Sequence, residues 1–217
     1  MAQDNGICER PQTRREELLN SVSHGLGFAL ASAGVPILIV GAVRHDSASA
    51  IVGASVFGAT MVLLYLASTV YHALPQCRLK DRFQIIDHSA IFLLIAGTYT
   101  PFTLGVLWGG WGWSLFGVVW GLAAIGIALK ALAGVRFPLI STSLYVGMGW
   151  LGVVACAPLW HYLPSNGWIW LLSGGVAYTA GVAFFAADRF LYLHFVWHLF
   201  VLVGTSCHFV AVLNYAA

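Results

Sequence analysis

Charged residues are missing from five long stretches of this chain, and their absence constrains the fold more than any other feature. The uncharged stretches are 26, 31, 42, 51 and 28 residues long and cover residues 18–43, 47–77, 88–129, 137–187 and 190–217. A helix that crosses the hydrocarbon core of a bilayer needs about 20 apolar residues. The stretches therefore accommodate one, one, two, two and one crossings, which predicts an all-α integral membrane protein built as a seven-transmembrane helix bundle.

The composition excludes the main alternatives to a membrane protein. Of the 217 residues, 59% are hydrophobic and only 8% are charged. A soluble domain needs charge on about a quarter to a third of its surface, and a disordered chain needs low hydrophobicity. Soluble, disordered and disulfide-rich secreted proteins are therefore excluded. The net charge of +2 gives no reason to expect a nucleic-acid partner.

Turn-forming residues divide the two longest stretches. The run WGGWGW at residues 108–113 and the run LPSNGW at residues 163–168 combine helix-breaking residues with tryptophans typical of membrane interfaces. The predicted helices cover roughly residues 20–43, 51–74, 84–107, 113–132, 138–160, 168–187 and 190–214. Residues 1–19 are then a cytoplasmic N-terminal tail, and residues 20–214 form the seven-helix membrane domain. The spacings Gly105/Gly109 and Gly117/Gly121 predict close helix packing inside the bundle.

The basic residues predict the orientation. With the N-terminus in the cytoplasm and the C-terminus outside, nine of the ten Lys and Arg residues lie on the cytoplasmic side, and only Arg44 lies outside. An inside N-terminus disfavours a G-protein-coupled receptor, and the last helix lacks the lysine that a retinal protein requires. We therefore expect a multi-pass protein of its cell's inner (plasma) membrane, in contact with the bilayer and its lipids.

Ionisable side chains within the predicted helices gather at one depth. Such groups are costly in a membrane and usually face the bundle interior or a cavity, so each is a candidate functional residue. In the predicted topology all of them except His208 lie near the cytoplasmic ends of their helices. They are His24, His72, Asp87, His88, His194 and His198.

The histidine spacing predicts a metal site. His194 and His198 are four residues apart and so share one helix face, and His72 lies at the same depth on another helix. Three imidazole ligands are typical of a catalytic zinc site, in which a water takes the fourth position and its pKa falls to about 7. We predict that His72, His194 and His198 bind Zn²⁺. Nitrogen ligands disfavour calcium and magnesium but leave iron, copper and nickel open.

Two further residues complete the predicted site. Asp87 is expected to hydrogen-bond the metal-bound water or to act as general base. Ser68, one turn deeper than His72, is expected to hold a substrate carbonyl or the water. His208 lies ten residues beyond His198, about 15 Å along the helix, which is too far to bind the same ion. A lone histidine near an interface is more often structural, and this is how we interpret His24, His45, His88, His161 and His208 taken singly.

The same residues carry a family resemblance over nearly the whole chain. The ordered motifs resemble the hemolysin III family, the bacterial branch of the progestin and adipoQ receptor group, within a wider superfamily that includes alkaline ceramidases. They comprise Glu17, Asn20 and His24, then Ser68 and His72, then Asp87, His88, Gly97 and Pro101, and finally His194 and His198. The resemblance implies a seven-helix bundle with zinc on one histidine of helix two and two of helix seven, and with the aspartate of helix three contacting the zinc-bound water.

The resemblance implies a function that the residues alone do not fix. By similarity to ceramidases, the chain is expected to be a zinc-dependent hydrolase of lipid amide or ester bonds, with zinc-bound water as nucleophile and a role in membrane lipid homeostasis. The alternative is a zinc-containing membrane receptor or regulator without turnover, with His24 or His88 as a fourth ligand, or a hemolysin-type cytolytic protein. A proton or ion transporter has less support, because His208 is the main ionisable group in the outer halves of the helices.

Overall fold

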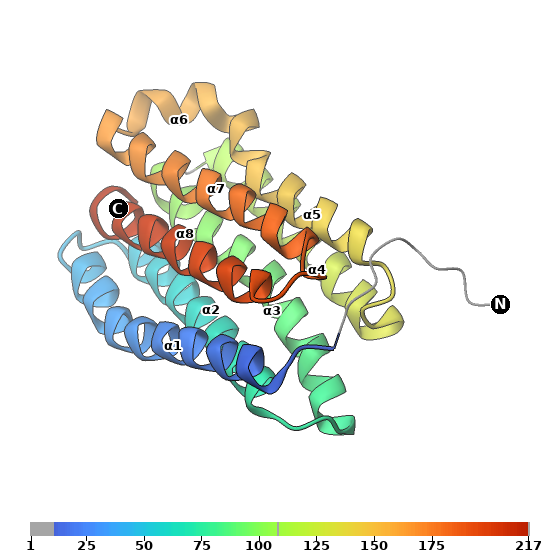
Figure 1. Ribbon diagram of the computed structural model, residues 1–217. Coiled ribbons are helices and arrows are strands. Elements are labelled where there is room, and N and C mark those ends of the chain that lie inside the picture. Colours follow the sequence, from blue (N-terminus) through green and yellow to red (C-terminus); the bar gives the residue numbers. More distant parts are fainter. Residues whose placement is uncertain (1–10, 108, 217) are drawn as a thin grey trace.

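The computed structural model describes residues 11–107 and 109–216, which form a bundle of helices with no strand among them (Figure 1). The α-helices are α1 (Arg14–Val43), α2 (Ala48–Ala73), α3 (Arg78–Pro101), α4 (Gly109–Ala133), α5 (Pro138–Trp150), α6 (Cys156–Tyr162), α7 (Ser165–Ala186) and α8 (Leu193–Tyr215). A π-helical turn, η1 (Phe102–Val106), continues α3, and a 3₁₀ segment, η2 (Leu151–Ala155), joins α5 to α6.

The prediction of seven membrane-spanning helices is confirmed. Within the described residues, seven helical segments are long and apolar enough to cross a membrane, with α3 and η1 forming one and α5, η2 and α6 forming another. Large apolar side chains are exposed on the outside of the bundle, as Leu30, Ile125 and Val176 illustrate. Such a surface is unfavourable in water and is the surface that lipid requires.

Several helix boundaries differ from the prediction, among them the start of α3, which begins at Arg78 rather than at residue 84. Two of the differences have clear local reasons. The first helix begins at Arg14, because Thr13 and Glu16 form a capping box: each side chain accepts a hydrogen bond from the other residue's backbone N–H. The last helix begins at Leu193, because the preceding Tyr192 has a left-handed backbone with φ 65°. Residues 1–10, about half of the expected tail, and Trp108 of the expected turn lie outside the described residues. The orientation of the termini stays a prediction.

Close helix approaches bring α1, α2 and α8 together near the predicted site. A Cβ atom added at Gly27 of α1 would lie 2.7 Å from the Tyr65 ring of α2 and 2.8 Å from Leu202 of α8. Only a glycine therefore fits here, one turn from His24. In Figure 1 the red α8 runs beside both the blue α1 and the orange α7. The N-terminal half of α1 thus lies next to the two helices that carry the predicted ligands.

The predicted close helix packing is found at one of the four glycines. A Cβ atom at Gly105 would lie 2.3 Å from the carbonyl oxygen of Ala216, so this glycine does sit in close packing. The prediction is wrong for Gly109, Gly117 and Gly121, where an added Cβ atom would meet nothing within 4 Å. Gly109 instead has φ 80°, a conformation that favours glycine at the start of α4.

We predict that Gly53→Ala destabilises the bundle and that Gly117→Ala does not. The new Cβ atom at position 53 would lie 2.6 Å from the Cα atom of Pro101, and backbone cannot yield as a flexible side chain can. Overpacking of this kind costs about 1–3 kcal/mol, or several degrees in melting temperature. Thermal unfolding of the detergent-solubilised protein measures it. Equal melting temperatures for the two variants would show that α2 and α3 separate easily.

Candidate metal centre

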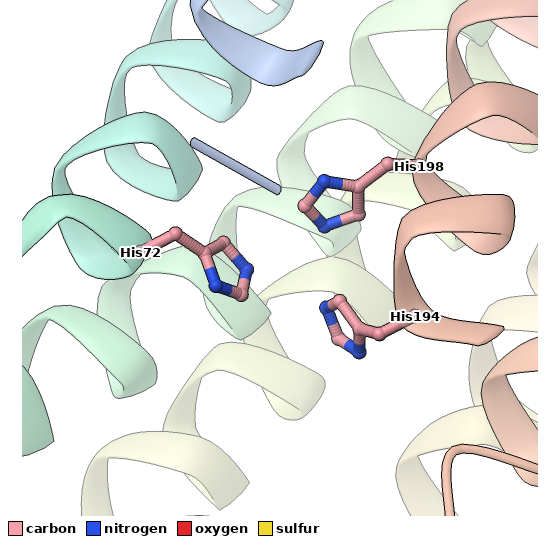
Figure 2. Close-up of side chains that lie close together, drawn as sticks. All are labelled: His72, His194 and His198. Carbon is pink, nitrogen blue, oxygen red and sulfur yellow. The ribbon is translucent and has the colours of Figure 1, made fainter. Parts of the chain in front are cut away.

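Three buried histidines from two helices converge on one point. His72 lies near the end of α2, and His194 and His198 lie in the first two turns of α8. Figure 2 shows the three rings facing one another, and one nitrogen from each lies within 4.8 Å of the others. These are the three residues that the sequence predicted as ligands. Among the described residues they form the one group of this kind, which includes neither His24 nor His88.

The His72 ring is held from behind by a carboxylate. Its Nδ1 atom lies 2.7 Å from Oε2 of Glu17, while Oε1 of the same carboxylate lies 2.9 Å from the Lys80 ammonium. Lys80 also donates hydrogen bonds to the carbonyl oxygens of Tyr71 and Leu74, at 2.9 and 3.1 Å. The buried ammonium therefore fixes both the carboxylate and the end of α2. Because a carboxylate can only accept, His72 carries its proton on Nδ1.

The His194 ring has an analogous partner on the loop between α7 and α8. Its Nδ1 atom lies 3.1 Å from Oδ2 of Asp188, six residues earlier in the chain. Gln12, just before α1, donates to the same oxygen at 3.4 Å and accepts a hydrogen bond from the Asn20 side chain. Asp188 is therefore tied to both α8 and α1.

The His198 ring is held by the backbone and a hydroxyl of α1. Its Nδ1 atom lies 3.3 Å from the Asn20 carbonyl oxygen and 3.2 Å from the Ser23 hydroxyl. Ser23 donates its own proton to the Asn20 carbonyl at 2.9 Å, so its oxygen is available to accept from the ring. His198 therefore also carries its proton on Nδ1.

The residues fit a metal ion. In each ring the Nδ1 proton is engaged by an acceptor, so Nε2 holds a lone pair, and the Nε2 atom of His72 is buried without a partner. Histidines that bind metals usually donate their second nitrogen in this way. Two nitrogen ligands of a tetrahedral zinc lie about 3.4 Å apart, a separation that falls within the 4.8 Å limit of the observed group. The carboxylates of Glu17 and Asp188 add negative charge that favours a cation.

A second carboxylate near the start of α1 fixes the start of α8. Oε1 of the buried Glu16 accepts a hydrogen bond from the Tyr192 backbone N–H at 2.8 Å. Oε2 of the same carboxylate bonds the backbone N–H and the hydroxyl of Thr13, at 2.9 and 2.8 Å. The left-handed residue that precedes α8 is thereby held to α1, and the position of both α8 histidines follows from it.

A cavity of about 120 Å³ borders the histidine group. Aliphatic and aromatic side chains of α2, α3, α5, α7 and α8 form most of its wall. Its polar side chains near the group are those of His24, Ser68, Asp87, His88, His194 and His198. His208 lines the other end, about 15 Å further along α8. A mostly apolar pocket with a few polar groups at one end is typical of a ligand site.

Asp87 and Ser68, the two other predicted site residues, both face this cavity. Both are buried. The Asp87 carboxyl group lies close to His194 and to the Ser68 hydroxyl, but the latter has no hydrogen-bond partner of acceptable geometry. The Ser68 hydroxyl is therefore a buried polar group without a partner, beside a buried carboxyl group on the cavity wall.

The remaining histidines lie outside the group. His208 bonds the Leu171 carbonyl oxygen through Nε2 at 3.2 Å, and its place along the helix keeps it from the group as predicted. The His24 ring stacks on His198 with ring centroids 3.5 Å apart and planes 8° from parallel. An imidazole binds a metal in its own plane, so two stacked rings cannot both aim at one ion. As arranged, His24 is not a fourth ligand.

Several residues at the site were not predicted from the sequence. Lys80 counts there only among the basic residues that predict the orientation, Asp188 has no part in the predicted site, and Glu16 and Gln12 fall within the predicted tail. The stripe of Glu17, Asn20 and His24 at helical spacing was the one signal of these contacts, because it places three polar groups on one face of α1. No spacing in the sequence connects Asp188 with α1.

Taken together, the fold and the site define a multi-pass membrane protein whose second and last spans bring three histidines together beside a buried cavity. Comparison with known proteins then gives its family. The chain belongs to the family described as Haemolysin-III related, which matches residues 12–209.

Its relatives cover nearly the full chain. It is 45% identical to Hemolysin-3 of Bacillus cereus over 93% of this chain and 92% of that protein. It is 43% identical to the Hemolysin-3 homolog of Bacillus subtilis (strain 168) over 94% and 95%, respectively. The human Monocyte to macrophage differentiation factor matches at 26% identity, over 83% of this chain and 79% of that protein. The family predicted from the sequence motifs is confirmed.

We predict that Glu17→Gln weakens metal binding without abolishing it. The amide can still accept from His72, but it loses the charge that attracts a cation and pairs with Lys80. Loss of such a partner typically lowers metal affinity 10- to 100-fold. Zinc affinity measured by competition with a chelator tests this. Asp81→Asn, an exposed carboxylate in the first turn of α3, is the control. Unchanged affinity in Glu17→Gln would exclude a role in metal binding.

Proposed function

We propose that this haemolysin III family protein is a zinc-dependent hydrolase of lipid amide or ester bonds in its cell's inner membrane. The supporting observation is the convergence of three buried histidines, each with its Nδ1 engaged, at the polar end of a mostly apolar cavity. The histidine group lies deep among the membrane-spanning helices, which favours a substrate that already lies in the bilayer.

His72, His194 and His198 are the proposed zinc ligands. When bound by three protein ligands, zinc acts as a Lewis acid toward a water or a carbonyl oxygen in its open position. The described residues bring no fourth ligand into the group, which supports a catalytic rather than a closed structural site. Iron, copper and nickel also accept such ligands, so zinc is the proposal rather than a property of the residues.

Asp87 is the proposed general base and acid. Its carboxylate accepts a proton from the water that attacks the carbonyl carbon, and returns it to the amine or alcohol when the bond to the acyl group breaks. Its position on the cavity wall, close to His194, suits this role. The unpaired Ser68 hydroxyl donates a hydrogen bond to the substrate carbonyl and so orients it.

The cavity supplies the binding of the acyl chain. Its aliphatic and aromatic wall runs from the histidine group toward His208. The cavity is therefore about as long as the segment of α8 between His198 and His208. Burial of each methylene of a chain contributes about 0.8 kcal/mol, so a lipid gains affinity without any polar contact there. We place the site at the cytoplasmic side of the membrane, because nine of ten basic residues favour that orientation.

A receptor or cytolytic role is the second candidate. The names of the relatives favour it: Hemolysin-3 of Bacillus cereus refers to lysis, and the human relative is called a differentiation factor. In that case the metal would stabilise the bundle and the cavity would bind a lipid without cleaving it. The two candidate functions make different demands on Asp87. A hydrolase requires this residue for catalysis, whereas a receptor or cytolytic protein requires it for folding at most.

We predict that Asp87→Asn retains zinc and loses hydrolysis. The amide keeps the shape of the side chain but cannot accept the proton, and loss of general acid–base catalysis typically lowers turnover about 10²- to 10⁴-fold. The purified protein is incubated with a panel of lipid amides and esters, and released fatty acid is measured by mass spectrometry.

Zinc content is measured in the same preparations of wild type and Asp87→Asn. A wild type that holds zinc but cleaves no member of the panel would favour the receptor or cytolytic role. Wild-type turnover in Asp87→Asn would show that Asp87 takes no part in catalysis.

A further inference from the structure

The cavity has an outer end, far from the histidine group, that the proposed chemistry does not use. It lies at the level of His208, about 15 Å beyond His198 along α8. On the helices around it, the lining residues furthest from the histidine group are Tyr99 of α3, Trp150 of α5 and Gly175 of α7. The side chains that close the cavity at this level limit the length of any chain that lies inside it.

Two aromatic side chains join neighbouring helices at this outer end. The Tyr99 hydroxyl lies 2.9 Å from the carbonyl oxygens of Met148 and Gly149, which joins α3 to α5. The Trp150 indole N–H donates a hydrogen bond to the Thr179 hydroxyl at 3.0 Å, which joins α5 to α7. Each ring would lose its hydrogen bond if it rotated out of the cavity wall, so both positions are fixed.

His208 joins α7 to α8 in the same way. Its Nε2 atom lies 3.2 Å from the Leu171 carbonyl oxygen of α7. The ring also packs on Gly174 so closely that an added Cβ atom there would collide with it, and the Tyr178 ring lies beside it with centroids 5.5 Å apart. Around the outer end of the cavity, α3, α5, α7 and α8 are therefore each joined to the next by a ring.

The wall between the two ends of the cavity favours an alkyl chain. It includes the side chains of Leu94, Ile95 and Val201, so each methylene group that enters gains favourable burial. A chain longer than the cavity has to displace one of the hydrogen-bonded rings or leave methylene groups outside. Close-packed interiors yield little to added volume, so the gain in affinity ends where the rings begin.

We propose that Tyr99, Trp150 and His208 form a stop that limits the length of the substrate's acyl chain. This rests on the proposed function in one respect, namely that the acyl chain enters the cavity from the histidine group. The stop then determines specificity, because chains that end before His208 lie wholly inside the cavity and longer chains do not. Gly175 lies beside the stop, and an added Cβ atom there would lie 3.9 Å from the Trp150 ring, an ordinary contact. A larger residue at position 175 therefore shortens the cavity without a clash at its Cβ atom.

A series of saturated methyl ketones tests this proposal by binding alone. These compounds keep the carbonyl group but have no bond that a hydrolase can cleave. Ketones with chains of eight to twenty carbons compete with tritiated 2-tridecanone for the full-length protein in detergent. Longer chains also enter micelles more readily, so the measured quantity is the affinity of each variant relative to wild type at each chain length. The contribution of the micelles cancels in this ratio.

Two variants are expected to shift the length limit in opposite directions. His208→Ala removes a ring of the stop and is expected to bind the longest ketones about tenfold more tightly than wild type, because two further methylene groups are buried. Gly175→Leu is expected to bind them about tenfold more weakly. Both should bind the eight-carbon ketone as wild type does, because it ends before the stop. Trp150→Leu replaces His208→Ala should the latter not fold.

Matched control variants lie outside the cavity. His161→Ala changes an exposed histidine of α6, and Gly147→Leu adds the same side chain on an exposed part of α5, where an added Cβ atom meets nothing within 4 Å. Both controls are expected to keep the wild-type profile. Zinc content and melting temperature are measured for every variant, so that a shift in the length limit is separated from a loss of metal or of folding.

The outcomes separate the stop from the hydrolase itself. Length profiles of folded His208→Ala and Gly175→Leu that coincide with wild type would overturn the stop and show that long chains leave the cavity by another route. Opposite shifts in the two variants, without cleavage of any lipid amide or ester by wild type, would support the stop and contradict the hydrolase. Cleavage of these lipids without any shift in binding would contradict the stop alone.

Discussion

The hydrogen bonds that hold three imidazole rings from behind are the interactions on which the functional end of this protein depends. An imidazole inside an apolar bundle is costly unless its polar atoms are engaged. Here Glu17, Asp188 and the Asn20 carbonyl accept the three Nδ1 protons, and the opposite nitrogens are turned toward one another. The cost of burial is therefore met on one side of each ring, and we propose that the other side binds a metal ion.

The first helix is accordingly more than a membrane span. It contributes no proposed ligand, yet its Glu17 and Asn20 hold two of the three rings, and its Glu16 fixes the start of α8. Gln12, just before α1, bonds the partner of the third ring. The glycine at position 27 lets this helix approach α2 and α8 closely enough to do so. The same approach carries His24 into the cavity. The positions of the three histidines thus follow from how α1 packs.

Sequence reasoning predicted the fold and the three histidines because both follow from local rules. Uncharged stretches of sufficient length predict spans, and His194 and His198 share a face whatever the rest of the chain does. The partners of the rings could not be predicted in the same way. The contact of Asp188 with His194, and of Glu16 with Tyr192, depends on a left-handed residue and on how α1 meets a distant loop. Charged side chains at the ends of helices, which no sequence pattern assigned to the histidine group, are part of its surroundings.

The central claim is that the three converging histidines bind a metal ion, and metal content measures it most directly. Wild type, His72→Ala and His194→Ala are purified from the same cells in the same detergent, and their metals are determined by mass spectrometry together with a test of folding. The account predicts about one zinc ion per wild-type chain and little or none in either folded variant. Equal metal content in all three proteins, or none in any of them, would contradict it.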